Sequence, residues 1–192
     1  MTIKLTGGIG KGQGLKVYQK GQVRPTSDKI RQAIFNILQH RFDADFENKR
    51  VLDLYAGSGS LGAEAWSRGA QWICAVESHK STAQVLHSNL SKLAPLLGGQ
   101  WFVRTQKVQS FLNQSSPQSV DFIFLDPPYQ EFVLPSLLDL FIQKGWVHTQ
   151  SLVVMEHSKR HDFDPSPEWD MVFRRKYGDT LVSICTLVEG EP

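Results

Sequence analysis

Apolar positions along the chain follow two alternating patterns. Short apolar runs, such as 120–125, are typical of strands buried on both faces of a parallel sheet. The longer segments between them, such as 134–141, have apolar residues three or four positions apart, which is the spacing of one helix face. The predicted strands are 51–56, 72–77, 101–104, 120–125 and 152–156, and the predicted helices are 61–68, 81–93, a short piece at 108–112, and 134–141. This alternation indicates a doubly wound α/β fold.

Two further segments extend the predicted fold. Residues 171–177 and 180–188 are strand-like runs joined at Gly178-Asp179, which is a hairpin signal. They predict antiparallel strands at one edge of an otherwise parallel sheet. Near the start of the chain, an apolar stripe over 30–38 predicts an additional helix before the first strand of the sheet.

The stretch 51–62 joins a strand, a glycine turn and the start of a helix. Gly57, Gly59 and Gly62 have the spacing of a dinucleotide-binding turn, and Glu77 lies 20 residues after Gly57, at the distance expected for a ribose contact. Glycines in such a turn let the backbone approach a ligand because no Cβ intervenes. On this pattern alone, an NAD-dependent hydride-transfer enzyme remains an alternative.

Two acidic positions favour a different cofactor. Asp53 lies inside the strand, four residues before the first glycine, where its carboxylate would repel a pyrophosphate and tolerate a cation. Asp126-Pro127-Pro128-Tyr129 follows the later strand 120–125. Ligands of open α/β sheets lie beyond the carboxyl ends of the strands. We therefore expect Asp53, the glycine turn, Glu77 and Asp126 to share one rim.

The charge of the chain is unevenly distributed. The net charge is only +2, yet residues 1–31 carry seven Lys and Arg residues against a single acid, Asp28. This segment therefore contributes +6, and the remainder of the chain sums to −4. Residues 1–23 are also rich in glycine, so we expect a pliable basic arm that binds phosphates, followed by one domain over 24–192.

Composition narrows the possible environments of the protein. A chain of 192 residues, 41% apolar and 21% charged, suits one globular domain. No apolar run approaches the ~18 residues needed to span a bilayer, and the start lacks the apolar core of a signal peptide. We expect a cytoplasmic protein without membrane attachment. Cys74 and Cys185 lie in strand-like segments, which indicates buried reduced thiols and no metal site.

With these motifs in place, the sequence resembles the RsmD-like family of bacterial 16S rRNA guanine-N2 methyltransferases over nearly its whole length. The segments that carry the resemblance are Thr6-Gly7-Gly8, residues 24–31, Phe35-Asn36-Ile37-Leu38, residues 52–62, Ser67-Arg68-Gly69-Ala70, Val76-Glu77 and Asp126-Pro127-Pro128-Tyr129. The resemblance implies a Rossmann-like methyltransferase fold, with a mostly parallel seven-stranded sheet and a C-terminal antiparallel hairpin. It also implies S-adenosyl-L-methionine as the cofactor and methylation of the guanine conventionally numbered 966.

The resemblance assigns the chemistry to the tetrapeptide that begins at Asp126. Asp126 and the carbonyl of Pro127 are expected to accept hydrogen bonds from the guanine amine, while Pro127 and Pro128 fix the backbone. The ring of Tyr129 is expected to stack on the extruded base. The substrate implied by the family is 16S rRNA or a small-subunit assembly particle, bound by a monomer.

Further residues are expected to bind the cofactor or the RNA. The candidates for cofactor binding are Asp53, Ala56, Gly57, Ser58, Gly59, Glu77 and, near the adenine where the family commonly has Asp or Asn, Gln106. The candidates for RNA binding are Lys11, Lys16, Arg24 and Arg31, although Arg24 and Arg31 could equally cap a helix and form salt bridges. Two other functions stay open at this point: an adenine-N6 nucleic-acid methyltransferase, whose members share the glycine turn and the Asp-Pro-Pro-Tyr motif, and a non-catalytic RNA-binding assembly module.

Overall fold

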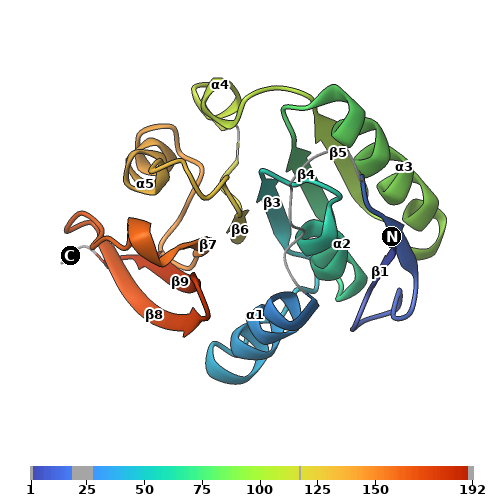
Figure 1. Ribbon diagram of the computed structural model, residues 1–192, viewed down its shortest axis with the longest axis horizontal. Helices are drawn as coiled ribbons and strands as arrows, with labels where there is room; N and C mark the ends of the chain where they lie inside the picture. The colour runs from blue at the N-terminus through green and yellow to red at the C-terminus, as the bar shows by residue number, and fades with distance from the viewer. Residues whose placement is uncertain (1, 19–27, 117, 190–192) are drawn as a thin grey trace.

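Seven strands form the central sheet of the computed structural model, which describes residues 2–18, 28–116 and 118–189. In chain order they are β3 (Arg50–Leu54), β4 (Trp72–Val76), β5 (Gln100–Arg104), β6 (Phe122–Leu125), β7 (Leu152–Ser158), β8 (Trp169–Tyr177) and β9 (Thr180–Leu187). Across the sheet the order is β5-β4-β3-β6-β7-β9-β8 (Figure 1). The first five of these strands are mutually parallel, and β9 is antiparallel to both β7 and β8. The predicted mostly parallel sheet with a terminal antiparallel hairpin is confirmed.

Helices cover both faces of this sheet (Figure 1). One face packs against α1 (Asp28–Arg41), α2 (Ser60–Ser67) and α3 (Lys80–Leu97), and the other against α4 (Val108–Leu112) and α5 (Leu134–Gln143). Successive residues of a strand point to opposite faces. Accordingly, Val51 of β3 belongs to the core beneath α1, α2 and α3, whereas Leu52 and Leu54 belong to the core beneath α4 and α5. Burial on both faces explains why the strands have continuous apolar sequences.

Strand order reverses between β3 and β6. From β3 the chain moves outward through β4 and β5, and it then returns to the other side of β3 to form β6. Such a reversal leaves a crevice at the carboxyl ends of the two central strands, because the connections on either side diverge there. Both sequence motifs, the glycine turn and the Asp126 tetrapeptide, immediately follow these two strands.

The described part of the predicted basic arm, residues 2–18, contains two short strands. Its strands β1 (Thr2–Lys4) and β2 (Gly14–Lys16) pair antiparallel, and Leu5 and Leu15 are buried in the core beneath α2 and α3. The connecting loop lies against the end of α2, where the Ile9 N–H donates to the Ser67 carbonyl at 2.8 Å. Gly8 has φ +69° there, and a Cβ would collide with that same carbonyl. Glycine in this segment therefore provides close packing as well as conformational freedom.

No helix among the described residues is both long and apolar enough to cross a bilayer. Cys74 and Cys185 are buried free thiols, as predicted.

Candidate functional site

The turn after β3 is built on left-handed backbone conformations. Tyr55, Gly57 and Gly59 have φ values of 59°, 54° and 80°, so the strand ends at Leu54, two residues earlier than predicted. Ala56 is buried, and its N–H donates to the Val76 carbonyl at the end of β4. Gly59 is the N-cap of α2, so the turn leads directly into the positive end of a helix. The backbone around Ser58 therefore lies where a ligand above β3 would meet it.

Glu77 holds this turn from the neighbouring strand. It directly follows β4, and one carboxylate oxygen accepts the Gly57 N–H at 3.0 Å. The other oxygen accepts the His79 N–H at 2.8 Å. Each carboxylate oxygen can accept more than one hydrogen bond, so Glu77 retains capacity for a ligand hydroxyl. The predicted neighbourhood of Glu77 and the glycine turn is thus present.

Asp53 lies beneath the turn and is almost completely buried, with 2% of its surface exposed. Its Oδ2 accepts the Gly62 N–H in the first turn of α2 at 2.8 Å. A Cβ on Gly62 would lie 2.9 Å from that oxygen, which explains the third glycine of the motif. The pKa of Asp53 is raised to about 8, chiefly by burial; the Gly62 hydrogen bond lowers it, and the charges of Asp126 and Glu77 raise it.

Asp126 lies beside the turn because β3 and β6 are paired in register. Leu54 is opposite Leu125, so the residues that follow, Tyr55 and Asp126, leave the sheet at the same level. Asp126 is half-buried and Pro127 is buried, whereas Pro128 is exposed. Electrostatic coupling among Asp53, Glu77 and Asp126 shows that these carboxyl groups share one region. In the described part of the chain, no three or more His, Cys, Asp or Glu side chains, these carboxyl groups included, form a group that could hold a metal ion.

Tyr129 is anchored by its hydroxyl to the far side of the crevice. Its oxygen lies 2.6 Å from the hydroxyl of Thr180 and donates a longer hydrogen bond of 3.4 Å to Glu156. The residue remains 41% exposed, so its ring is accessible while its hydroxyl is held. Partial burial raises the pKa of this phenol, which therefore keeps its proton at neutral pH.

Sequence reasoning missed these two anchors of Tyr129. Glu156 lies near the carboxyl end of β7, as Glu77 does at the end of β4, and an acid at the end of the predicted strand 152–156 was a usable signal. Thr180 carried no such signal. It is 51 residues from Tyr129 in the chain, and it reaches the site only because β9 pairs with β7, Thr180 opposite Ser158.

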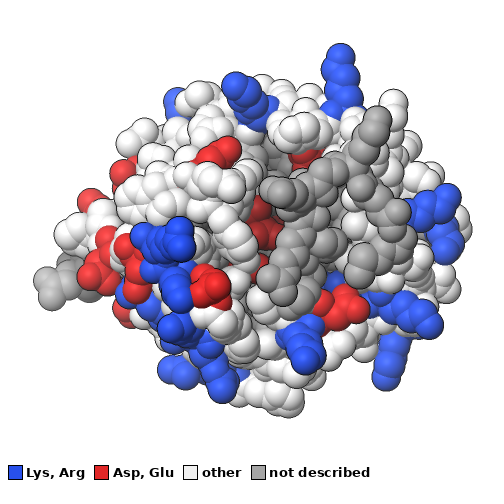
Figure 2. Space-filling view, in the orientation of Figure 1, with Lys and Arg blue, Asp and Glu red and all other residues white. Residues whose placement is uncertain are grey.

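The distribution of charge agrees with this placement of the acids. In Figure 2, acidic atoms are visible near the centre of the face, and Lys and Arg side chains lie along its edges together with further acidic side chains. Acidic groups at the centre favour a cation there.

The four candidate RNA contacts differ in how exposed they are to solvent. Lys11 and Lys16 are exposed on the N-terminal pair of strands, and Arg24 lies outside the described residues. Arg31 was predicted either to bind phosphate or to form salt bridges, and its side chain, which is 0% exposed, favours the second alternative. Its guanidinium donates to the Lys4 carbonyl at 2.7 Å and lies 3.1 Å from Asp28. Because the charge is enclosed by its own domain, a phosphate cannot reach it.

Arg31 also lies next to a buried carboxylate on α2. Its Nε is 3.8 Å from an oxygen of Glu64, which is itself 0% exposed. Glu64 in turn accepts hydrogen bonds from the N–H and hydroxyl of Thr6, at 2.8 and 2.7 Å, and from Arg68. These contacts connect α1, α2 and the N-terminal strands, which gives Arg31 a structural role.

The candidate for adenine recognition, Gln106, is half-buried in the connection between β5 and α4. This connection begins at the carboxyl end of β5, the strand next to β4 in the sheet. Gln106 is therefore on the same rim as Glu77, and its contact with a cofactor stays a prediction.

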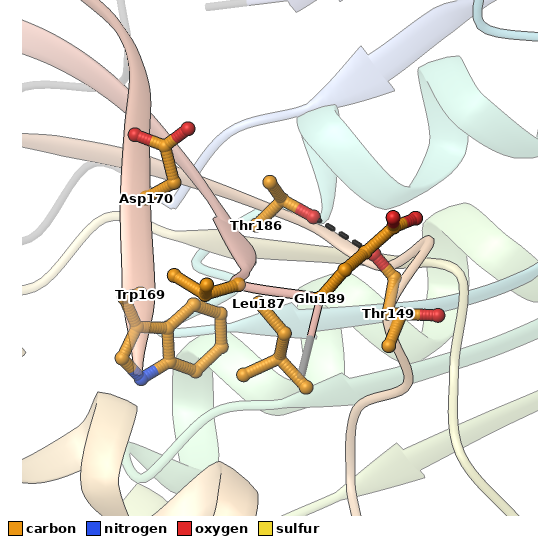
Figure 3. Close-up of a pocket in the computed structure, with 7 residues that line it drawn as sticks. Thr149, Trp169, Asp170, Thr186, Leu187 and Glu189 are labelled. Carbon is orange, nitrogen blue, oxygen red and sulfur yellow. Dashed lines mark hydrogen bonds between the residues drawn. The ribbon is translucent and has the colours of Figure 1, made fainter. Parts of the chain in front are cut away.

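A separate surface cavity of about 390 Å³ lies at the opposite edge of the sheet (Figure 3). It is lined by Thr149, Trp169, Asp170, Thr186, Leu187, Val188 and Glu189. Because Cys185 of β9 is opposite Val153, the later residues of β9 lie beside the amino end of β7. None of the described candidate site residues lines this cavity, and the site is the rim at the carboxyl ends.

Comparison with known proteins bears on this site. Residues 3–186 match the family described as "Conserved hypothetical protein 95". Ribosomal RNA small subunit methyltransferase D of Escherichia coli (strain K12) is 31% identical over 171 residues, which cover 88% of this chain and 82% of that protein. The solved structure of the Escherichia coli protein yhhF has a TM-score of 0.83 and 28% identity, covering 97% of this chain and 98% of that one.

A more distant solved structure shows the same fold with a ligand. An RNA methyltransferase from Salinibacter ruber in complex with S-adenosyl-L-homocysteine has a TM-score of 0.63 and 18% identity, covering 88% of this chain and 97% of that one. The fold is thus that of S-adenosylmethionine-dependent methyltransferases, as the sequence predicts. The family match spans almost all of the chain, including the glycine turn and the Asp126 tetrapeptide, and the chain therefore belongs to the conserved hypothetical protein 95 family as an RsmD-like member.

Proposed function

We propose that this protein transfers a methyl group from S-adenosylmethionine to the exocyclic N2 amine of a guanine in 16S rRNA during small-subunit maturation, with guanine 966 as the target. Family membership supports the coarser statement, methylation of ribosomal RNA with S-adenosylmethionine. The observation that carries the proposal is the placement of Asp53, Glu77 and Asp126 around the glycine turn, where strand order reverses.

The three carboxyl groups suit a cationic cofactor. Burial is the main cause of the raised pKa of Asp53, and the like charges of Asp126 and Glu77 add to it because they destabilise its ionised form. A bound cation relieves this repulsion, whereas the pyrophosphate of NAD would increase it. S-adenosylmethionine supplies a methyl group bound to a positively charged sulfonium. In this proposal Glu77 holds the ribose hydroxyls, and the backbone at Ala56, Gly57, Ser58 and Gly59 lies against the cofactor.

Asp126 and Pro127 are proposed to orient the attacking amine. The lone pair of a guanine amine is delocalised into the ring, so the amine must be positioned and polarised before it attacks. The Asp126 carboxylate and the Pro127 carbonyl accept its two N–H groups. As the nitrogen forms its bond to the methyl carbon, the bond between that carbon and the sulfur breaks and S-adenosylhomocysteine is the leaving group. The nitrogen becomes positively charged, the carboxylate stabilises that charge, and loss of one N–H proton gives the neutral methylated amine. The two prolines hold both acceptors in place, which reduces the entropy lost on reaching the reactive geometry.

Tyr129 is proposed to hold the base that has been rotated out of the RNA. Its hydroxyl is bound to Thr180, so the orientation of the ring is set before the base arrives. Its exposed face then provides a stacking surface worth about 1–3 kcal/mol. The exposed Lys11 and Lys16 bind RNA phosphates in this proposal, while Arg31 is withdrawn from the RNA-binding set because it is buried.

Nucleoside analysis tests the proposal. Small-subunit particles from a strain that lacks this protein are incubated with the full chain and methyl-labelled S-adenosylmethionine, and the RNA is digested to nucleosides. We expect the label in N2-methylguanosine, and none with the Asp126→Asn variant. Label in N6-methyladenosine would establish the adenine alternative. Cofactor binding without label in any nucleoside would instead indicate a non-catalytic RNA-binding module.

A further inference from the structure

The side chain of Asn89 connects three separate parts of the protein. Asn89 lies in the middle of α3 and is 3% exposed. Its Nδ2 donates to the carbonyl of Ser58 at 2.9 Å and to the carbonyl of Lys16 at 2.9 Å. Its Oδ1 accepts the Lys16 N–H, also at 2.9 Å. Both hydrogens of the amide and its oxygen are thus engaged with backbone.

The two partners of Asn89 belong to the two binding regions of the proposed function. Ser58 is the residue between Gly57 and Gly59 in the cofactor turn. Lys16 is the last residue of β2, and its exposed side chain is a proposed phosphate contact. Residues 16 and 58 are far apart in sequence, yet the same buried amide holds the backbone of both.

The surroundings make this connection stiff. A Cβ on Gly59 would lie 2.4 Å from Cδ1 of Leu86, one turn before Asn89 on α3, so the turn packs directly on this helix. On the other side, the hydroxyl of Ser67 on α2 accepts the Gly10 N–H at 2.9 Å and donates to the Gly7 carbonyl. The N-terminal strands are therefore docked on both helices that flank the turn. Movement of β2 changes the partners of Asn89, and leaving a buried amide without partners is unfavourable.

We propose that Asn89 is a positioning residue that couples RNA binding at β2 to cofactor binding at the glycine turn. This inference rests on the proposed function. Phosphates bound at Lys16 restrain the backbone of β2, β2 restrains the amide of Asn89, and the amide holds the carbonyl of Ser58 in the conformation that receives the cofactor. By thermodynamic linkage, RNA then increases the affinity for the cofactor, and the cofactor increases the affinity for RNA by the same factor.

Hydrogen exchange on the wild-type chain gives the first test, with S-adenosylhomocysteine as the probe and no RNA. The Lys16 N–H, which donates to Asn89, should exchange at least about fivefold more slowly when the probe is bound, in keeping with the smallest usual couplings. The Lys144 N–H at the end of α5, on the other face of the sheet, should be unaffected. Binding of the probe without any change at Lys16 would overturn the inference, whereas failure to bind the probe would overturn the proposed function.

Calorimetry with variants gives the second test. The affinity for S-adenosylhomocysteine is measured with and without a 16S rRNA transcript, for the wild type and for Asn89→Ala, Asn89→Asp and the control Ser88→Ala. Ser88 is the exposed neighbour of Asn89 on the same helix. We expect the transcript to increase the affinity about fivefold or more in the wild type and in Ser88→Ala. In both Asn89 variants, the transcript should no longer increase the affinity for S-adenosylhomocysteine. A folded Asn89 variant that keeps the factor would show that Asn89 is only structural, and an unchanged affinity in the wild type would show that the sites are independent.

Discussion

The Gly62 N–H donates to Oδ2 of Asp53 at 2.8 Å, within a contact so close that a Cβ on residue 62 would nearly touch the carboxylate. This relationship fixes Asp53 beneath the cofactor turn, where burial raises its pKa to about 8. An acid with a raised pKa binds more protons in the folded than in the unfolded state between pH 3.8 and about 8. The contribution of Asp53 to stability therefore declines as the pH rises through this range.

The same pKa predicts how cofactor affinity depends on pH. A sulfonium favours ionised Asp53, so binding of S-adenosylmethionine should release a proton below pH 8. We expect affinity to rise between about pH 6 and 8, by at most about tenfold per unit, and then to level off. Calorimetry at several pH values measures this.

Two comparisons control the pH experiment. S-adenosylhomocysteine has no sulfonium charge, so its affinity should depend less on pH, and Asp53→Asn should flatten the profile for S-adenosylmethionine. Because Nδ1 of His79 lies 3.3 Å from Glu77, the measurement is repeated with His79→Gln. If the pH dependence of S-adenosylmethionine affinity were lost with His79→Gln but retained with Asp53→Asn, its assignment to Asp53 would be wrong.

The anchored hydroxyl of Tyr129 leads to a graded series of variants. Tyr129→Ala removes the ring and should reduce turnover about tenfold to a hundredfold, in line with loss of a stacking interaction. Tyr129→Phe and Thr180→Val both remove the hydrogen bond between the two hydroxyls, and Tyr129→Phe also removes the longer one to Glu156. Each should cost only about twofold to tenfold. Because Thr180→Val removes no contact of Tyr129 that Tyr129→Phe leaves intact, the double variant should be little worse than Tyr129→Phe alone. Turnover of Tyr129→Phe as low as that of Tyr129→Ala would assign the function to the hydroxyl and refute the stacking role.

Burial of Arg31 predicts a loss of stability rather than of RNA affinity. Arg31→Met removes the hydrogen bond to the Lys4 carbonyl and one of the charged neighbours of buried Glu64, which keeps Arg68 and Thr6. It should lower the free energy of unfolding by about 1–3 kcal/mol, measured by denaturant titration. Lys11→Gln and Lys16→Gln should have little effect on stability. Each should instead reduce the slope of log affinity for RNA against log salt by about 0.7–0.9. Lys144→Gln, at the end of α5, serves as the control. A reduced salt slope for folded Arg31→Met would restore Arg31 to the RNA-binding set.

The contrast between Arg31 and Asp126 shows what the sequence can predict. The strand–turn–helix pattern and the Asp126 tetrapeptide are local, since each consists of residues adjacent in the chain, and both were recognised directly. The rim could also be predicted, because the carboxyl ends of parallel strands meet at one edge. For Arg31 the sequence left phosphate binding and salt bridges equally open, because its neighbours in space, Lys4 and Glu64, are distant in sequence and only tertiary packing encloses the charge.

The same limit applies to the N-terminal strands and to the anchors of Tyr129. Glycine-rich sequence indicated a pliable segment, but Leu5 and Leu15 gain enough burial on α2 and α3 to order it. Asn89 forms its hydrogen bonds with the backbone of Ser58 and Lys16, which lie 31 and 73 residues away from it in the chain. No pattern within one element contains that information.

Replacement of Asp126 separates catalysis from binding. The Asp126 carboxylate is proposed to act on the amine as positive charge develops, so Asp126→Asn should reduce turnover about a hundredfold or more while leaving the affinity for S-adenosylhomocysteine within a few-fold of the wild type. Single-turnover kinetics and calorimetry measure the two quantities. Asp121 provides a matched control at the other end of β6, where its carboxylate accepts the Arg50 N–H at 2.8 Å. Asp121→Asn should affect stability and leave turnover of the folded protein intact. If Asp126→Asn kept near wild-type turnover, the carbonyl of Pro127 would have to orient the amine alone, and the catalytic role of Asp126 would be wrong.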